Sequence, residues 1–473
     1  MKKFILIFCL LFIAVKGISQ QFSQYNTGTL YDSFENPSQR AFVPDTSRAF
    51  ASNFFIPNFD ANFLLKGNAQ ASLVSRAFGD SYNNAALQIG SGNYNHTTAF
   101  GNAYLLMVKM FASLNGDEEI GFFMNTKAEG RGDFTDESVA LFDGSSAFPN
   151  NIYDNFFNDH YYYQLYNSIG LTYKEKLSSQ FTIGIKLGVL MGINYNKLDI
   201  EESHVNFDKL NDNADISLRG RYHLSKSPGS IEANDLLPSF RSPGAQLSVG
   251  TSYRTEDGIT IQGNLKDLGF IHWYSNSKIS DFNSSTTVVG LSTAAREQNM
   301  YEGISSIISS AARQSSFTSY TNALVELSAT KSFYLDNNKS FKYSPTLIAS
   351  KELLYNGFTG VLVNDFQYDD FHVGLTGSYD NYNLFKLGMQ LMYKAPNVEF
   401  YIGSDRLTHT IGLASVKSNP DSYTNGSFTG ADFFLGFSIK FGHVIEHPLN
   451  ASTIPTGDKG FLGRLWNRLF KTY

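Results

Sequence analysis

The chain has 473 residues, of which 41 are Phe, 27 are Tyr and 2 are Trp, while only 17% are charged. This aromatic content excludes an intrinsically disordered chain, because a chain with so many aromatic side chains would collapse to bury them away from water. The net charge of −6 and the single cysteine, Cys9, argue against a nucleic-acid-binding protein, against disulfides and against a cysteine metal site.

Residues 1–19 have the features of an export signal. Two lysines precede an apolar run from Phe4 to Val15, which as a helix of about 18 Å is too short to cross a ~30 Å hydrocarbon core. Gly17 and Ser19 then fit the small-residue preference of signal peptidase. We therefore predict a signal peptide over 1–19 and export of the rest of the chain.

Strict alternation marks the segment 181–195. Its apolar positions are Phe181, Ile183, Ile185, Leu187, Val189, Met191, Ile193 and Tyr195, and most positions between them are small or polar. A period of two indicates a β-strand, and this run is longer than the about 9–11 residues that cross a membrane at a tilt of about 45°.

The same pattern recurs along the chain. Candidate strands are 103–114, 119–131, 160–174, 180–197, 213–224, 244–254, 258–268, 317–335, 341–352, 357–368, 370–380, 384–394, 396–404 and 429–442, with one or two more between 49 and 75. Aromatic residues cluster near strand ends, as in the interfacial girdles of membrane barrels, and a sheet in lipid must close on itself. We predict an all-β fold, a transmembrane antiparallel β-barrel of about 14 strands (12–16), rather than a soluble sandwich.

The barrel is predicted to fill residues 20–442, with an N-terminal hatch over about 20–60. Longer connections at 132–158, 225–242 and 405–428 are predicted to be extracellular loops. A helical segment over 295–313 is expected either over the barrel or inside it. Its apolar side carries Met300, Ile304, Ile307 and Ile308.

The last strand has the spacing of a barrel-assembly signal, although one more amphipathic strand would give the same pattern. The signal residues are Phe434, Gly436, Ile439 and Phe441. The tail 443–473 then carries a cationic amphipathic helix, either on the periplasmic membrane surface or in the barrel mouth; the alternative is a tail packed on a partner. Its interfacial residues are Arg464, Trp466, Arg468 and Phe470.

Charged residues fall on the polar faces of the predicted strands and would face the lumen. They are Lys127, Glu129, Arg131, Lys186, Lys386, Lys394 and Glu399. Two interpretations stay open: a lining that selects solutes, or an ion-paired interior that fills a closed barrel.

One segment, His443–His447, matches the H-x-x-E-H pattern of zinc proteases. It directly follows a strand and Pro448 stops it, so a helix that presents both imidazoles to zinc is hard to build. We expect no enzyme, and therefore no catalytic residue, metal ion or cofactor.

Two segments resemble known families. Residues 20–25, leading to Asn36-Pro37-Ser38, resemble the N-termini of FadL-like barrels of Bacteroidota-type outer membranes, which implies that Asn36 and Pro37 lie in a hatch. The stretch 265–273 resembles a motif of a large family of uncharacterised outer-membrane barrels in those bacteria. Its motif residues are Asp267, Leu268, Gly269, Phe270 and Trp273. A strand end with a glycine bulge and an interfacial Trp is the simpler interpretation of that motif.

The resemblance implies a protein of the outer membrane of a Gram-negative bacterium, in a family without an agreed activity. We expect a passive conduit for small solutes, apolar ones among them. The alternative is a non-conducting scaffold barrel of a cell-envelope complex, associated with type IX secretion or gliding. The expected partners are outer-membrane lipids, the barrel-assembly machinery, a small apolar solute and, for the scaffold, a cell-envelope protein, but no nucleic acid.

Overall fold

The structure, a computed structural model, describes residues 22–79, 81–112, 118–226, 233–274, 276–381, 384–416, 430–446 and 460–462. The predicted signal peptide and the interfacial residues Arg464, Trp466, Arg468 and Phe470 lie outside these ranges. No helix in the described part of the chain is long and apolar enough to cross a membrane.

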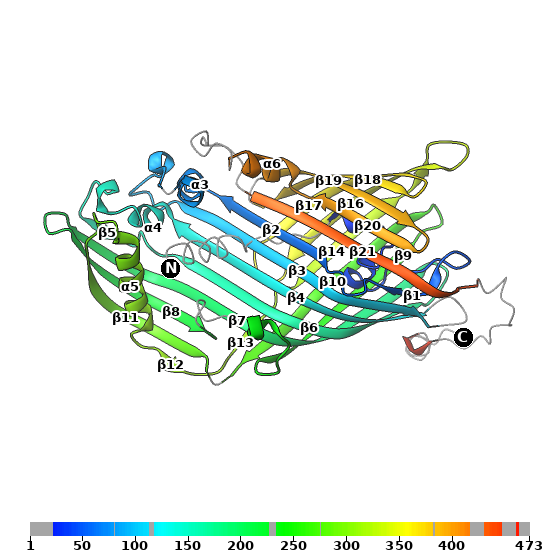
Figure 1. The fold of residues 1–473 in the computed structure, drawn as a ribbon, viewed down its shortest axis with the longest axis horizontal. Helices are drawn as coiled ribbons and strands as arrows, with labels where there is room; N and C mark the ends of the chain where they lie inside the picture. Colours follow the sequence, from blue (N-terminus) through cyan, green and yellow to red (C-terminus); the bar gives the residue numbers. More distant parts are fainter. Residues whose placement is uncertain are drawn as a thin grey trace.

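A closed antiparallel barrel of 14 strands forms the larger part of the molecule (Figure 1), which confirms the predicted fold class. In chain order its strands are β1 (Arg48–Ser52) with β2 (Asn58–Lys66), β3 (Tyr94–Phe111), β4 (Glu118–Thr135), β6 (His160–Lys176), β7 (Phe181–Asp208), β9 (Pro243–Arg254), β10 (Ile259–Trp273), β13 (Phe317–Tyr320) with β14 (Leu324–Lys331) and β15 (Phe333–Tyr334), β16 (Phe341–Glu352), β17 (Phe358–Tyr368), β18 (Phe371–Asp380), β19 (Phe385–Ala395), β20 (Val398–Ser404) and β21 (Gly430–Val444). Strand β21 closes the sheet, because it pairs with β20 on one side and with β1 and β2 on the other.

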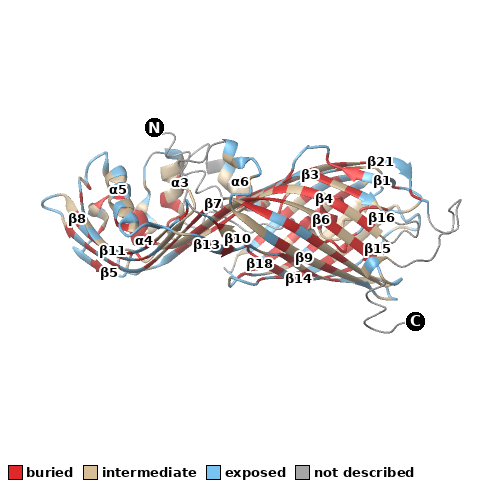
Figure 2. Ribbon diagram, turned by 90° about the horizontal axis from the view of Figure 1, so that it is seen from below, coloured by how far each residue is buried: buried red, intermediate tan, exposed pale blue. Residues whose placement is uncertain are grey.

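Burial alternates along the barrel strands (Figure 2). On β19, Phe385, Leu387 and Leu391 point outward and are 60%, 47% and 50% exposed, whereas Lys386 and Gln390 between them are buried in the lumen. Apolar side chains on the outside of the barrel and charged side chains in its lumen are the reverse of the arrangement in a water-soluble barrel. This alternation gives the barrel an apolar outer belt.

The two ends of the barrel differ. Short turns such as 177–180, 369–370 and 396–397 join strands at one end, here called the turn end. The longest connections, such as 67–93 and 136–159, leave the opposite end, the loop end.

A second body, here called the lobe, projects from the loop end (Figure 1). Its sheet joins the far half of β7 to β5 (Ile152–Asp154), β8 (Asn213–Leu224), β11 (Lys278–Val289) and β12 (Arg313–Gln314). Helices α4 (Asp136–Leu141) and α5 (Arg296–Ser309) and the turn η3 (Ser145–Ala147) accompany this sheet. The predicted apolar face of the helix is confirmed, because Met300 and Ile307 are buried in the lobe core and Ile304 and Ile308 pack against it.

Two expectations about this region were wrong. Segment 213–224 is a strand of the lobe and not of the barrel, while the fourteenth barrel strand is the bent pair β1 and β2. The helix within 295–313 packs on β11 and β8, and not over or inside the barrel. The period of two tells only that one strand face is apolar; it does not tell whether lipid or a helix covers that face.

The remaining helices among the described residues are short. They are η1 (Phe22–Gln24), α2 (Asp32–Glu35), α3 (Gln70–Gly79), η2 (Asn84–Ala86), η5 (Ala233–Leu236) and α6 (Leu407–Val416). Of these, η1 and α2 belong to a segment inside the barrel, residues 22–47, which is here called the hatch. The predicted hatch of 20–60 was too long at its C-terminal side, because residues 48–52 and 58–66 pair within the barrel wall.

Candidate functional site

Wall carboxylates hold the hatch along its whole length. The backbone N–H groups of Phe22, Leu30 and Ala41 donate hydrogen bonds of 2.8, 2.8 and 3.1 Å to the carboxylates of Asp405, Glu399 and Glu119, respectively. Such hydrogen bonds are strongest where the carboxylate is ionised, as for Glu399 and Glu119, which also form ion pairs with lysines. The hatch is therefore tied to the wall through its main chain, near its tip, its middle and its base.

Wall side chains also donate to hatch carbonyl groups. Lys109 Nζ donates to Ser33 O at 3.2 Å, Asn264 Nδ2 donates to Glu35 O at 3.0 Å, and Lys394 Nζ donates to Thr27 O. A buried segment without sheet or long helix needs such partners, since unpaired buried backbone groups are costly. The wall replaces the hydrogen bonds that regular secondary structure would supply.

The segment Asn36-Pro37-Ser38 lies directly against the glycines of two wall strands. A Cβ atom at Gly184 would lie 2.0 Å from Pro37 O, and one at Gly250 would lie 2.2 Å from Asn36 Oδ1. Asn36 Nδ2 donates to Gln262 Oε1 at 3.1 Å, and Asn36 Oδ1 accepts from Ser38 Oγ at 2.7 Å. The backbone of the hatch fits here because the wall has no side chains at these two positions.

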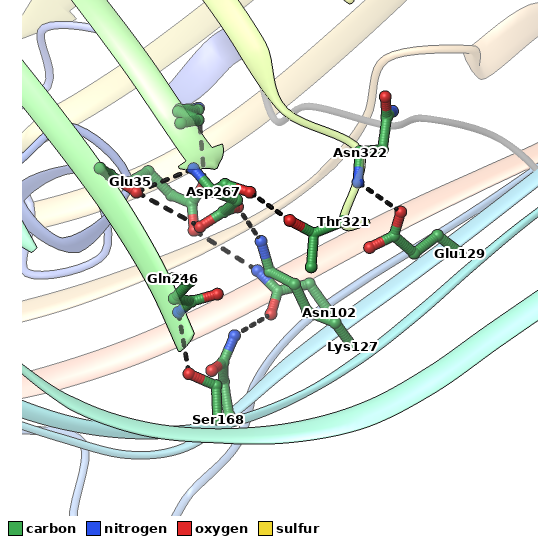
Figure 3. A network of polar contacts seen from close by, with 12 residues as sticks. Glu35, Asn102, Lys127, Glu129, Ser168, Gln246, Asp267, Thr321 and Asn322 are labelled. Carbon is green, nitrogen blue, oxygen red and sulfur yellow. Dashed lines mark hydrogen bonds and ion pairs between the residues drawn. The ribbon is translucent and has the colours of Figure 1, made fainter. Parts of the chain in front are cut away.

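The charges of the central lumen gather around Asp267 (Figure 3). This carboxylate contacts Lys127 Nζ and lies 3.8 Å from Lys186 Nζ. Its side chain is 9% exposed, and those of the two lysines are 5% and 1% exposed. Asp267 itself occupies a bulge of β10, where its φ of 51° is in the left-handed region that Asp tolerates better than most residues.

The same network reaches the hatch through Glu35. Lys266 Nζ lies 3.4 Å from Glu35 Oε2 and 3.3 Å from Glu326 Oε2, so it joins the hatch to the wall. Tyr104 Oη donates to Glu35 Oε1 at 2.8 Å and accepts from Lys186 Nζ at 2.8 Å. Hatch and wall thus share one set of alternating charges.

Further ion pairs line the lumen towards both ends. They are Lys109 and Lys174 with Glu119, Lys440 with Glu399, Lys386 with Asp380, and Arg131 with Glu352. Glu129 accepts hydrogen bonds from Tyr166 Oη at 2.6 Å and from the backbone N–H of Asn322 at 3.0 Å. Every predicted lumen residue lies on the inner side of the wall and has a hydrogen-bond or ion-pair partner.

Two small cavities lie between hatch and wall in the described part of the chain. A cavity of about 30 Å³ lies among the central charges, bounded by Tyr31, Glu35, Lys127, Glu129, Lys266 and Asp267. A second cavity of about 50 Å³ lies near the hatch tip, among Phe22, Arg131, Glu352, Asp380, Lys386 and Arg406. Each has room for only a few water molecules, since one water needs roughly 10–15 Å³ by this measure.

The residues of the other predicted motifs are placed as follows. Leu268 and Phe270 are 44% and 46% exposed on the outer belt, whereas Trp273 is buried and its Nε1 donates to Ser319 Oγ at 2.9 Å. The interpretation of Trp273 as an interfacial residue was therefore wrong, and the bulge lies at Asp267 rather than at Gly269, whose Cβ would lie 2.5 Å from Ala245 O.

The four residues of the suggested assembly signal do not share a face. Phe434 and Gly436 point inward against Tyr401, whereas Ile439 and Phe441 lie on the outer side of β21. Among the described residues, no group of three or more His, Cys, Asp or Glu side chains is arranged to hold a metal ion.

Sequence reasoning missed several residues that hold the hatch. Glu35, Lys109, Glu119, Lys174 and Asp405 all contribute to it. For Lys109 a signal was present, because it alternates with apolar neighbours within a predicted strand. The carboxylates at strand ends, such as Glu119 and Asp405, have no such periodic context.

Comparison with known proteins gives one family and several distant structures. No sequence among the curated proteins matches the chain. In outline it is similar to the toluene transporter TodX of P. putida, with 8% identity, a TM-score of 0.41 and coverage of 87% of this chain and 94% of that chain. It is also similar to a FadL homologue of Pseudomonas aeruginosa, with 11% identity, a TM-score of 0.41 and coverage of 89% and 96%.

The family assignment comes from a match of the sequence to a family model. Residues 41–405 match the model of a family of unknown function, DUF5723. This match spans most of the barrel and the whole lobe, and it includes Asp267 with its lysine partners. The chain therefore belongs to the DUF5723 family of unknown function.

Proposed function

We propose that this protein is an outer-membrane conduit for small solutes that the hatch holds closed. The observation that carries the proposal is a separate segment inside a closed barrel, tied to the wall by polar contacts rather than by strand pairing. Such a segment can leave the lumen without breaking the barrel ladder, because none of its residues belongs to that ladder.

The apolar outer belt supports a place in the outer membrane of a Gram-negative bacterium. Backbone groups in lipid must be paired within the protein, and a closed barrel meets that condition. Lipids and the barrel-assembly machinery are then partners of this chain. The short turns would face the periplasm, and the lobe would project outside the cell.

The lining supports one class of solute over another. Lysines, arginines and carboxylates face the lumen, so polar or charged solutes would find hydrogen-bond and ion-pair partners along it once the hatch has moved. An apolar solute gains little from such a lining, and its passage would need a path beside these charges rather than between them.

Removal of the hatch tests the proposal. We expect the full-length chain to be nearly silent in planar lipid bilayers, and a chain that lacks residues 22–42 to conduct at least about tenfold more current. A comparison of vesicle swelling in sugars with the uptake of an aromatic hydrocarbon then shows whether the barrel passes polar or apolar solutes. A hatch-free barrel that is folded, as its heat-dependent gel mobility would report, but passes no ions contradicts the proposal.

A further inference from the structure

Part of the outer wall is polar at positions that should meet lipid. Thr126 and Asn167 are cross-strand partners on β4 and β6, and their neighbours Lys127 and Tyr166 point into the lumen, so Thr126 and Asn167 point outward. On β7, Asn194 pairs with the outward-facing Leu165. Polar side chains on a lipid-facing surface need partners, because lipid offers no hydrogen bonds.

These outward residues are nevertheless buried. Asn167, Asn194 and the neighbouring Met191 are 4%, 0% and 1% exposed, whereas Val189 and Leu187, which follow towards the turn end of β7, are 46% and 57% exposed. Another segment of the chain therefore covers the outer wall around Asn167, and the wall is uncovered nearer the turn end.

Residues 233–242, here called the flap, cover the wall at Asn167, whereas Asn194 Nδ2 donates to Lys226 O at 3.0 Å. Asn167 Nδ2 donates to Leu236 O at 2.8 Å, and Asn167 Oδ1 accepts from Thr126 Oγ1 at 2.6 Å. At the end of the flap, the N–H of Gly192 donates to Ser242 O at 2.7 Å. Since the side chain of Asn167 points away from the lumen, the flap lies on the outside of the barrel. The sequence predicted an extracellular loop over 225–242, of which residues 233–242 run along the outer side of the wall.

The outer side of the flap is apolar. Leu236, Leu237 and Phe240 are 49%, 63% and 71% exposed, and Arg241 beside them is also exposed. A surface loop in water would present the opposite arrangement, with polar groups outward. Here Leu236 O meets Asn167 of the wall, while Leu236, Leu237 and Phe240 expose apolar side chains, as Leu187 and Val189 do on β7.

We propose that the flap is a lipid-binding element, whose Leu236, Leu237 and Phe240 lie among the acyl chains at the outer edge of the surrounding leaflet. Arg241 at its end suits the anionic head groups at that boundary, as basic residues flank apolar ones in interfacial segments. The inference rests on the membrane placement in the proposed function, but not on the hatch or on conduction.

Single-cysteine labelling tests the flap. Cys9 is replaced by Ser, so that a new cysteine is unique, and Leu237→Cys, Leu187→Cys and Leu210→Cys are each spin-labelled in phosphatidylcholine vesicles. Leu187 reports the bare belt, and Leu210, 98% exposed at the β7–β8 turn of the lobe, reports water. We expect the label at 237 to collide with oxygen in preference to a water-soluble nickel complex, as at 187 and in contrast to 210.

Each other outcome overturns a defined statement. A label at 237 that behaves like the label at 210, or that neither reagent reaches, contradicts lipid contact of the flap. A label at 187 that reports water contradicts the membrane placement itself. As a second measurement, Asn167→Leu removes the donor to Leu236 O and should sharpen the spectrum of the label at 237, whereas Ile169→Leu, on the same outer face, should not change it.

Discussion

Two alanines at the glycines beneath the hatch should open the barrel. In the double variant Gly184→Ala and Gly250→Ala, the new Cβ atoms would lie 2.0 Å from Pro37 O and 2.2 Å from Asn36 Oδ1. At Gly184 the new Cβ atom would clash with the hatch backbone at Pro37. Strand β7 is hydrogen-bonded to β6 and β9 on its two sides, so we expect the hatch, which wall side chains hold, to move rather than the strand. We expect the single-channel conductance in planar bilayers to rise at least about tenfold over that of the unchanged chain.

The matched control is another inward-facing glycine. At Gly374 a Cβ atom would lie 3.5 Å from Gln390 Cβ and 3.8 Å from Ser23 Cβ, which is ordinary contact. Gly374→Ala should therefore leave the conductance unchanged. Equal, low conductance of the double variant and the control, with both barrels folded, would mean that the seat of Asn36 and Pro37 does not keep the lumen closed.

Loss of the Asp267 carboxylate should have the largest effect on stability. Asp267→Ala leaves Lys127 and Lys186 without the carboxylate that they share, in a site from which water is largely excluded. Breaking one partner of a buried pair typically costs about 3–5 kcal/mol. The temperature at which the folded band on a detergent gel converts to the unfolded one should fall accordingly.

Two further variants separate charge from backbone effects. Asp267→Asn keeps a residue that tolerates the φ of 51° but removes the charge, so most of the loss should persist. Asp257→Ala, in the exposed turn between β9 and β10, should leave the transition where it is. If Asp267→Ala and Asp257→Ala unfold at the same temperature, the cluster around Asp267 does not stabilise the barrel.

The fold could be predicted because lipid imposes a simple pattern. Strands such as 181–195 and 385–393 alternate so regularly that the fold class follows, whereas the predicted number of 14 agrees only because the wrong strand 213–224 offsets the missing pair β1 and β2. The assignment of individual strands failed where the pattern is ambiguous: β8 in the lobe alternates as a barrel strand does, since helices cover its apolar face. The first barrel strand was indistinct because a bend at residues 53–57, with positive φ at Phe54 and Phe55, divides it.

The site was less predictable than the wall. Alternation placed Lys127 and Lys186 on the inner side, but their common partner Asp267 lies 140 positions after Lys127, across the lumen. Only the closed barrel brings these strands face to face. Several contacts of the hatch run through its backbone, as at Phe22, Leu30 and Ala41, and a sequence carries little information about which backbone N–H will donate to a distant carboxylate.

The base of the hatch has a consequence for how the pore would reseal. Residue 47 is followed directly by β1, and the N–H of Ile445, beyond the end of β21, donates to Ser47 O at 3.0 Å. The hatch is therefore attached to the wall at the turn end without a flexible linker. Reclosure is then a unimolecular event, with an effective local concentration of about millimolar or higher. The open lifetime should therefore be independent of how many copies the membrane holds, and a free peptide of the same sequence would compete poorly for the seat.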